Sequence, residues 1–339
     1  MRLRRSDCSG PGIRRQVRGR GFSYANADGS PITEEDGARI AELVIPPAWT
    51  DVWICPWSNG HIQATGTDAA GRRQYRYHDV WRIHRDREKF ERVVEFARLL
   101  PGLRRKVDRD LSGPDLDRAR VLAAIVRLLD VGLFRIGGEE YAEEHETFGV
   151  ASLRKEHVHI RDGAMVFDYP AKGSIQRKVE VRDEPVAAVV DSLRRRRSGD
   201  NLFAYKNGKR WCDVHAADVN EYIKELAGDR YSAKDFRTWS ATMLAAVALA
   251  AAGPMPDSKT RRKRLVAGAV KEVAAQLGNT PTVCRSSYID PRVIDRYDAG
   301  ETIADLVRRL PDLEQLAEGG AARRRQVEQA VIALIEADS

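Results

Sequence analysis

Five residues of the kinds that catalyse phosphoryl transfer stand at expected junctions between secondary-structure elements. They are Arg135, Lys172, Arg237, Asn279 and Tyr288. Phosphodiester transfer without a metal ion passes through a five-coordinate phosphorane with extra negative charge, and the departing oxygen is a strong base. Arginine suits neutralisation of that charge, because its planar guanidinium matches phosphate oxygens and stays charged at any working pH. Lysine suits protonation of the departing oxygen, because its pKa can shift and it can release a proton.

The local sequences predict where these side chains lie. Arg135 precedes an expected helix start, Lys172 lies at the tip of an expected β-hairpin, and Arg237 precedes a long expected helix. Asn279 follows the end of another expected helix, and Tyr288 comes nine residues later. Among 57 lysines and arginines, any one of these cations is a surface charge when taken singly. Only the ordered set is informative.

The ordered set resembles the type IB DNA topoisomerases of bacteria and poxviruses. Residues 133–137 (Leu-Phe-Arg-Ile-Gly) match the first arginine box of that family, and residues 235–239 (Asp-Phe-Arg-Thr-Trp) resemble its second. Residues 141–149 resemble the family's Tyr-x-Glu-x-x-x-Thr-x-Gly stretch, and residues 286–291 (Ser-Ser-Tyr-Ile-Asp-Pro) are similar to its nucleophile segment. The resemblance covers most of the chain, about residues 20–297.

The resemblance implies a role for each candidate. Arg135 and Arg237 would hold the scissile phosphate, and Lys172 would be the general acid for the 5′ oxygen. Tyr288 would attack the phosphorus and leave a 3′-phosphotyrosine. Asn279 stands where the poxvirus enzymes have a histidine, and bacterial members vary at this position. A carboxamide can donate a hydrogen bond to a phosphate oxygen but cannot carry charge or shuttle a proton, so a positioning role is favoured.

Tyr288 has two competitors as the nucleophile. Tyr297 lies nearby in the sequence, and Tyr141 lies near Arg135. A tyrosine with an ordinary pKa of about 10 is mostly protonated at neutral pH, so it needs adjacent positive charge or a proton acceptor. Tyr288 has the family motif and the spacing from Asn279, and we therefore assign it as the nucleophile.

Four residues nearer the N-terminus are candidate DNA contacts: Gln74, Tyr75, Tyr77 and His78. Residues 74–77 (Gln-Tyr-Arg-Tyr) resemble a strand of the family that contacts DNA from the other side. In the major groove, glutamine can read adenine and an aromatic ring can touch a thymine methyl group. The alternative is a half-buried sheet in which these aromatic side chains only pack.

The pattern predicts an α+β fold with two domains. Short strand-like pieces separated by turn residues indicate a small, mainly β domain at residues 1–84. Helical periodicity then predicts a larger, mainly α domain at residues 85–339, with a β-hairpin region over residues 157–181. The resemblance implies the catalytic fold that type IB topoisomerases share with tyrosine recombinases.

Two local features complete the expected fold. Residues 1–20 carry seven arginines and one acid and are expected to form a mobile basic arm. The helix that follows the first domain is expected to end at Pro101-Gly102. The apolar run 241–252 is too short to span a bilayer and indicates a buried helix.

Charge and motif content limit which partners and cofactors are expected. The formal net charge of +7 suits a polyanion, and we expect duplex DNA, clamped by a monomer. The sequence has no phosphate-binding loop motif, no closely paired cysteines and no histidine spacing typical of ligands, so neither a nucleotide cofactor nor a metal is expected. With no secretory signal recognised, a cytoplasmic, nucleoid-associated protein is expected.

Two alternatives remain open at this point. A tyrosine recombinase or integrase would share the Arg, Lys, Arg, Tyr scheme and the catalytic fold. Recombinases usually have a histidine three residues before the second arginine, where this chain has Lys234, and a compact β domain favours a clamp over synapsis. A non-catalytic DNA-binding protein would explain the charge but not the ordered set that ends at Tyr288.

Overall fold

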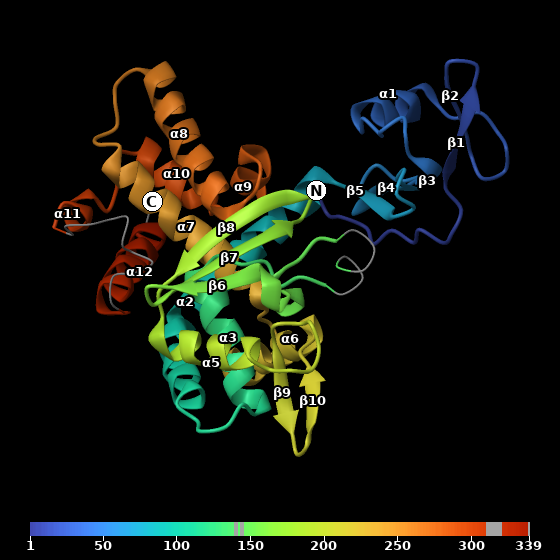
Figure 1. Ribbon diagram of the computed structural model, residues 1–339. Helices are drawn as coiled ribbons and strands as arrows, with labels where there is room; N and C mark the ends of the chain where they lie inside the picture. Colours follow the sequence, from blue (N-terminus) through green and yellow to red (C-terminus); the bar gives the residue numbers. More distant parts are fainter. Residues whose placement is uncertain (139–141, 143–145, 310–320, 338–339) are drawn as a thin grey trace. The chain divides into compact units, whose positions relative to one another are not determined.

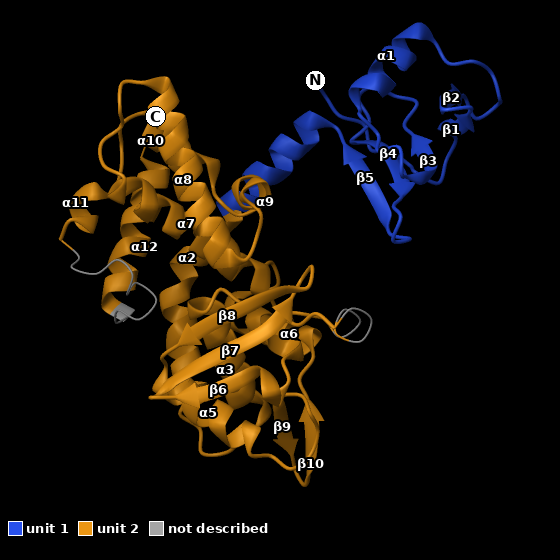
Figure 2. Ribbon diagram, turned by 45° about the horizontal axis from the view of Figure 1, so that its top comes forward, with its two compact units in different colours: residues 1–91 blue, residues 92–339 orange. Residues whose placement is uncertain are grey.

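The computed structural model describes residues 1–138, 142, 146–309 and 321–337. The chain divides into two compact units, Met1–Glu91 and Arg92–Ser339 (Figure 2). Helix α2 (Asp79–Leu111) begins in the first unit and ends in the second. The domain boundary expected near residue 84 therefore falls inside a continuous helix.

The first unit is built on a five-stranded antiparallel sheet in the order β2-β1-β3-β4-β5. The strands are β1 (Ile13–Arg18), β2 (Gly21–Ala25), β3 (Thr50–Ile54), β4 (Ile62–Thr67) and β5 (Arg73–Tyr77). A small core joins the sheet to helix α1 (Glu34–Glu42) through Ile13, Ile40, Val52, Ile54 and Ala64. The mainly β character predicted for this region is confirmed.

The expectation of a mobile arm over residues 1–20 is wrong. Ile13, which is 1% exposed, opens strand β1, and this strand pairs with both β2 and β3. Earlier still, the Arg4 backbone N–H donates to the Asn59 carbonyl (2.9 Å), and the Arg4 carbonyl accepts from the His61 N–H (2.9 Å). Arginine content alone indicated mobility, but backbone pairing and one buried side chain order the segment.

The second unit combines helices with two small antiparallel sheets (Figure 1). Its helices after α2 are α3 (Arg118–Val131), α5 (Glu184–Arg194), α6 (Ala216–Ala227), α7 (Ala233–Ala251), α8 (Lys259–Leu277), α9 (Pro281–Ser287), α10 (Pro291–Asp298), α11 (Ala304–Val307) and α12 (Ala321–Glu336), with short 3₁₀ turns at Val150–Ser152 and Lys155–His157. The sheets are β6 (Val158–Arg161), β7 (Ala164–Ala171) and β8 (Ile175–Val181), and a hairpin of β9 (Ala204–Asn207) and β10 (Arg210–Asp213) that the sequence did not predict.

Helix α7 is the apolar helix predicted around residues 241–252, and it is buried along most of its length. Its many alanines let α3, α8, α10 and α12 pack closely against it. Ser232 and Asp235 form a capping box at its N-terminus. Arg237, which was expected to precede the helix, therefore lies inside it, in the second turn. This position turns its side chain into the core.

Helix α2 does not end at Pro101-Gly102 as expected, but continues to Leu111. Leu100, Leu103 and Val107 are all buried in the same core, so one apolar face continues across the proline. Proline removes one backbone hydrogen bond from a helix interior, and the burial on both sides of it offsets this local loss. None of the helices in the described ranges is long and apolar enough to span a membrane.

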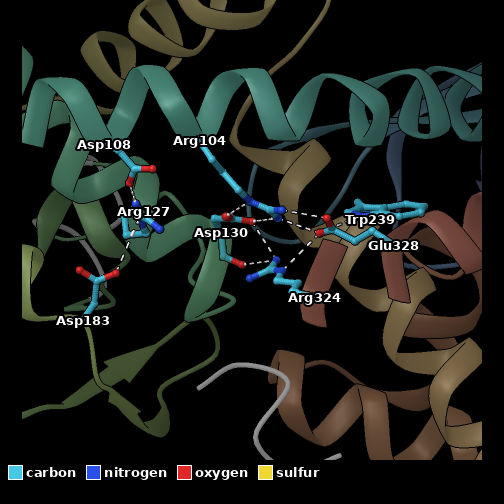
Figure 3. A network of polar contacts seen from close by, with 8 residues as sticks. All are labelled: Arg104, Asp108, Arg127, Asp130, Asp183, Trp239, Arg324 and Glu328. Atoms are coloured by element: carbon cyan, nitrogen blue, oxygen red, sulfur yellow. Dashed lines mark hydrogen bonds and ion pairs between the residues drawn. The ribbon is translucent and has the colours of Figure 1, made fainter. Parts of the chain in front are cut away.

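A buried ionic network fastens the C-terminal helix α12 to α2, α3 and α7 (Figure 3). Arg104 Nε donates to Asp130 Oδ2 at 2.7 Å, and Arg104 Nη2 donates to Glu328 Oε1, also at 2.7 Å. Arg324 Nη2 donates to Asp130 Oδ1 at 2.8 Å. Trp239 Nε1 donates to Glu328 Oε1 at 3.4 Å. Val327, Val331 and Ile335 of α12 are buried in the core of the second unit. Trp239 lies only two residues from Arg237.

Candidate active site

The hairpin of β7 and β8 presents Lys172 at its tip, as the sequence predicted. Ala171 and Ile175 are the last paired residues, and Lys172 is exposed in the turn between them. Gly173 and Ser174 adopt positive φ angles of 79° and 57°, which a tight reversal of the chain requires. The lysine is therefore held on a short turn with its ammonium group accessible.

Arg135 lies in an irregular segment that a close backbone approach holds in place. The carbonyl of Arg135 accepts from the Val150 N–H at 2.8 Å. Gly137 (φ 83°) and Gly149 lie so close together that a Cβ on Gly149 would come within 2.3 Å of the Gly137 nitrogen. Arg135 and Gly137 of the first arginine box thus make a close backbone contact with Gly149, the last residue of the 141–149 stretch, and with Val150. The helix start expected after Arg135, and Tyr141, lie outside the described residues.

Arg237 is 3% exposed and points at the same irregular segment. Its Nη1 donates to the Leu133 carbonyl, and its Nη2 donates to the Leu277 carbonyl at 2.9 Å. Burial and the nearby Arg135 guanidinium lower the pKa of Arg237 to about 10, and Tyr288 opposes this decrease. The Arg237 guanidinium carbon lies 5.4 Å from the centroid of the Tyr288 ring.

Helix α8 ends where the arginines converge. Gly278 caps it in the left-handed conformation, with φ 63° and ψ 44°. Arg135 Nη2 donates to the Gly278 carbonyl at 2.6 Å and also to Asn279 Oδ1. The carbonyls at the C-terminus of a helix lack intrahelical partners and carry partial negative charge, so they favour nearby cations. The end of α8 therefore holds both predicted arginines and Asn279 together.

Arg177 is a third guanidinium in this cluster, and the sequence reasoning missed it. It lies on β8, is 9% exposed, and donates through Nη2 to the carbonyls of Leu133 (3.2 Å) and Gln276 (3.1 Å). A signal was available, because Arg177, Val179 and Val181 alternate along the strand and share its inward face. An arginine among valines on that face indicates a buried guanidinium.

The two polar atoms of the Asn279 carboxamide differ in their hydrogen bonding. Its Oδ1 accepts from Arg135, whereas its Nδ2 is buried and makes no hydrogen bond in the described structure. A buried donor without a partner is costly, and such groups in native structures need an explanation. A phosphate oxygen beside Arg135 would satisfy it.

Tyr288 caps helix α9 and is half-buried. Its backbone N–H donates to the Cys284 carbonyl at 3.0 Å, and its own carbonyl lies 3.2 Å from the Thr242 hydroxyl on α7. Its competitor Tyr297 is only 1% exposed in α10, and its hydroxyl has no hydrogen-bond partner in the described part of the chain. Of these two tyrosines, only Tyr288 lies beside a candidate arginine.

A cavity of about 460 Å³ opens between the β7–β8 hairpin and the end of α8. Arg135, Lys172, Arg177 and Gly278 are among its lining residues, so Lys172 and Arg135 face one space. Within the described ranges, neither Arg135, Arg177 nor Arg237 forms an ion pair with a carboxylate; backbone carbonyls hold all three. The described residues also contain no group of three or more His, Cys, Asp or Glu side chains suited to a metal ion.

The four candidate DNA contacts of the first unit do not share one face. Along edge strand β5, Tyr75 and Tyr77 are exposed on the same side with their rings stacked, 6.0 Å between centroids. Gln74 lies on the opposite side, where its Nε2 donates to Asp68 Oδ2 at 2.9 Å. The His78 Nδ1 accepts from the Val80 N–H at 3.1 Å, at the start of α2. Strand β5 therefore exposes Tyr75 and Tyr77 on one face and carries Gln74 on the other.

Comparison with known proteins places these features in a family. Residues 78–314 match the family model of the eukaryotic DNA topoisomerase I catalytic core, and residues 21–68 match that of the bacterial DNA topoisomerase IB N-terminal domain. DNA topoisomerase 1B of Acanthamoeba polyphaga mimivirus is 33% identical over 294 residues, which cover 84% of this chain and 87% of the viral protein. DNA topoisomerase 1B of vaccinia virus is 21% identical over 78% of this chain and 84% of its own length.

The family matches define the class of protein as an enzyme that acts on DNA. More closely, this chain belongs to the type IB DNA topoisomerases, which relax supercoiled duplex DNA through transient cleavage of one strand. The resemblance drawn from the arginine boxes and the tyrosine segment is confirmed, and with it the α+β fold class.

Proposed function

We propose that Tyr288 carries the strand cleavage of this topoisomerase. Its phenolic oxygen attacks the scissile phosphorus, the bond from phosphorus to the 5′ oxygen breaks, and a 3′-phosphotyrosine forms. The phenolic proton passes to water, and Lys172 gives a proton to the departing 5′ oxygen. Religation reverses each step: the 5′ hydroxyl attacks, its proton returns to Lys172, and Tyr288 departs. The phosphotyrosine conserves the bond energy, so the cycle needs no nucleotide.

Arg135 and Arg237 stabilise the non-bridging oxygens of the phosphorane. Within the described ranges, both guanidiniums are held by backbone carbonyls and neither pairs with a carboxylate, which leaves their positive charge available to the phosphate. A preorganised cation in a site that excludes water stabilises developing charge without reorganisation. Asn279 adds a neutral donor, because its Nδ2 has no partner among the described residues while Arg135 holds its Oδ1.

The observation that carries this assignment is the position of Arg237 against Tyr288. The guanidinium carbon lies 5.4 Å from the ring centroid, and the same arginine reaches the end of α8 beside Asn279. A nucleophilic tyrosine needs adjacent positive charge, and a phosphate bound by the arginine would lie next to the phenol.

Between cleavage and religation, the free 5′ end can rotate and release torsional strain of either sign.

The test compares Tyr288→Phe with Tyr297→Phe on supercoiled plasmid, in EDTA and without ATP. Tyr288→Phe removes only the nucleophilic oxygen, so it should bind DNA and lose both relaxation and adduct formation. Tyr297→Phe removes a buried hydroxyl for which the described residues provide no partner, so the variant should relax plasmid like the parent. Relaxation by Tyr288→Phe at the parental rate would refute the proposal.

We further propose that the chain acts as a monomer that clamps duplex DNA, with no nucleotide cofactor, on the nucleoid. The exposed pair Tyr75 and Tyr77 supports a DNA-facing role for β5. Gln74 would contribute only after its Nε2 leaves Asp68, and His78 would contribute through its other ring nitrogen, because its Nδ1 accepts from the Val80 N–H. A clamp with about 6 phosphate contacts should show a log–log salt slope near about −5 for binding. A slope near zero, or a dimer at working concentration, would contradict it.

A further inference from the structure

Arg177 connects three segments that carry separate catalytic candidates. Its backbone lies on β8, five residues after Lys172. Its Nη2 donates to the carbonyl of Leu133, two residues before Arg135, at 3.2 Å. The same nitrogen donates to the carbonyl of Gln276, three residues before Asn279, at 3.1 Å. One buried side chain therefore bridges the hairpin, the first arginine box and the end of α8.

The end of α8 is shaped around this guanidinium. A Cβ on Gly278 would lie 2.6 Å from Arg177 Nη1, closer than any side-chain atom can be accommodated without movement. The left-handed conformation of residue 278 favours glycine, and a side chain there would also displace the Arg177 guanidinium. Three consecutive carbonyls, of Gln276, Leu277 and Gly278, each bind a different arginine: Arg177, Arg237 and Arg135 respectively.

Arg177 has no neutralising partner in the described residues, and burial lowers its pKa. Its polar contacts are the two backbone carbonyls and the Tyr169 side chain. A buried cation without a carboxylate partner is costly, so its retention at this place points to a task that an apolar side chain cannot perform. Its Nε is buried without a hydrogen bond among the described residues, and its Nη2 is bonded to two backbone carbonyls. These contacts are those of a residue that positions the neighbouring segments of the chain.

We propose that Arg177 is a positioning residue that acts through Arg135, by fixing the Leu133 carbonyl and the α8 terminus relative to each other. This inference rests on the proposed function, because it assumes that Arg135 binds the scissile phosphate. Loss of Arg177 leaves the Leu133 carbonyl to Arg237 and frees the Gln276 carbonyl. Arg135, which is tied to both segments, then loses its set position against the phosphate.

The experiment measures single-turnover cleavage of a duplex at saturating enzyme, with the DNA dissociation constant measured separately. Arg177→Met keeps volume but removes charge and donors, and it should slow cleavage about 10- to 100-fold while the dissociation constant changes less than about threefold. Arg177→Lys retains the charge and one donor direction, so it should recover part of the rate. In an Arg135→Ala background, Arg177→Met should slow cleavage by less than about threefold, because residues that act as one unit are not additive.

Arg196→Met is the matched control. Arg196 is 8% exposed and, like Arg177, binds backbone carbonyls, those of Asn201 (2.7 Å) and Ser198 (2.6 Å); unlike Arg177, it also lies 3.9 Å from the Asp213 carboxylate. It should lower the melting temperature as Arg177→Met does but leave the cleavage rate unchanged. If Arg177→Met does not fold, Arg177→Lys decides alone, and a parental rate for it overturns the inference.

The outcomes separate this inference from the proposed function. If the parent and the Arg196→Met control form no covalent adduct, the proposed function fails. If both cleave and folded Arg177→Met cleaves equally well, only the positioning role of Arg177 is wrong. If the Arg177→Met and Arg135→Ala defects multiply in full, Arg177 does not act through Arg135, and the inference is likewise overturned.

Discussion

The hydroxyl of Thr242 lies 3.2 Å from the backbone carbonyl of Tyr288 and accepts the backbone N–H of Asp290 at 3.1 Å. Thr242 is 1% exposed in the middle of α7, the helix that also carries Arg237. One hydroxyl thus links the buried helix to the backbone carbonyl of the nucleophile and to the backbone N–H two residues later. The candidate phosphate ligand and the candidate nucleophile are positioned from the same rigid element.

Thr242→Val should therefore damage both stability and cleavage. The substitution keeps the shape of the side chain but leaves the buried Asp290 N–H without an acceptor, which costs about 1–3 kcal/mol. Thr242→Ser keeps the hydroxyl and serves as the control. Urea unfolding and single-turnover cleavage measure the two effects. Equal cleavage rates for the valine and serine variants would show that this contact does not position Tyr288.

Asn279 should act as a hydrogen-bond donor. Asn279→Asp keeps an acceptor for Arg135 but removes the Nδ2 donor and adds negative charge beside the phosphate, so cleavage should fall by at least about 10²-fold. Asn279→His should retain substantial activity, because an imidazole N–H can also donate. Single-turnover rates compare the two variants, and a parental rate for Asn279→Asp would refute the donor role.

The network around Asp130 should make the fold sensitive to acid. Burial opposes ionisation, but Arg324 and Arg104 lower the pKa of Asp130 to about 2, from the ordinary value of 3.8. Because the folded pKa is the lower one, the stabilisation is fully present above about pH 4 and is lost as pH falls through about 2. Its size is on the order of 2 kcal/mol.

Asp130→Asn tests this prediction. At pH 7 the variant should be less stable by about 3–5 kcal/mol, because Arg104 and Arg324 lose a buried partner. The difference in unfolding free energy between the parent and the variant should shrink as pH falls from 4 to 2. Urea unfolding at several pH values measures it, and a constant difference would contradict the lowered pKa.

Lys172 should matter only when the leaving group needs a proton. Lys172→Ala should slow cleavage of normal DNA by roughly 10²–10⁴-fold. With sulfur in place of the bridging 5′ oxygen, the leaving group is a thiolate with an ordinary pKa of about 8.5, which departs unprotonated. The Lys172→Ala defect should then largely vanish, while Arg135→Ala and Arg237→Ala defects persist. A Lys172→Ala defect that sulfur does not rescue would make this lysine a phosphate ligand or a structural residue.

Much of the candidate site could be predicted because its residues lie in short local motifs. The boxes and turns around Arg135, Lys172 and Tyr288 single these residues out as candidates, and the turn residues predict the hairpin region over residues 157–181. The ordering of residues 1–20 could not be predicted, because it depends on pairing with distant strands. The helix through Pro101 was missed because burial of a continuous apolar face outweighed a local stop signal.

Arg177 was missed for a related reason. Its neighbours Gln176 and Lys178 are polar, so the segment looks like a solvated strand until alternation separates its two faces. Its partners, the carbonyls of Leu133 and Gln276, have no sequence signature at all. Backbone acceptors at helix ends become visible only when the fold brings them together.

The central claim is that Tyr288 becomes covalently joined to a 3′ phosphate, and peptide mapping of the trapped adduct tests it most directly. Denaturant added during cleavage of a duplex labelled on its 3′ phosphate side would trap the intermediate, and protease digestion with mass spectrometry would locate the nucleotide. The account predicts a single modified peptide that contains Tyr288, linked to the 3′ end of the broken strand. An adduct on another tyrosine, or a linkage to the 5′ end, would contradict it.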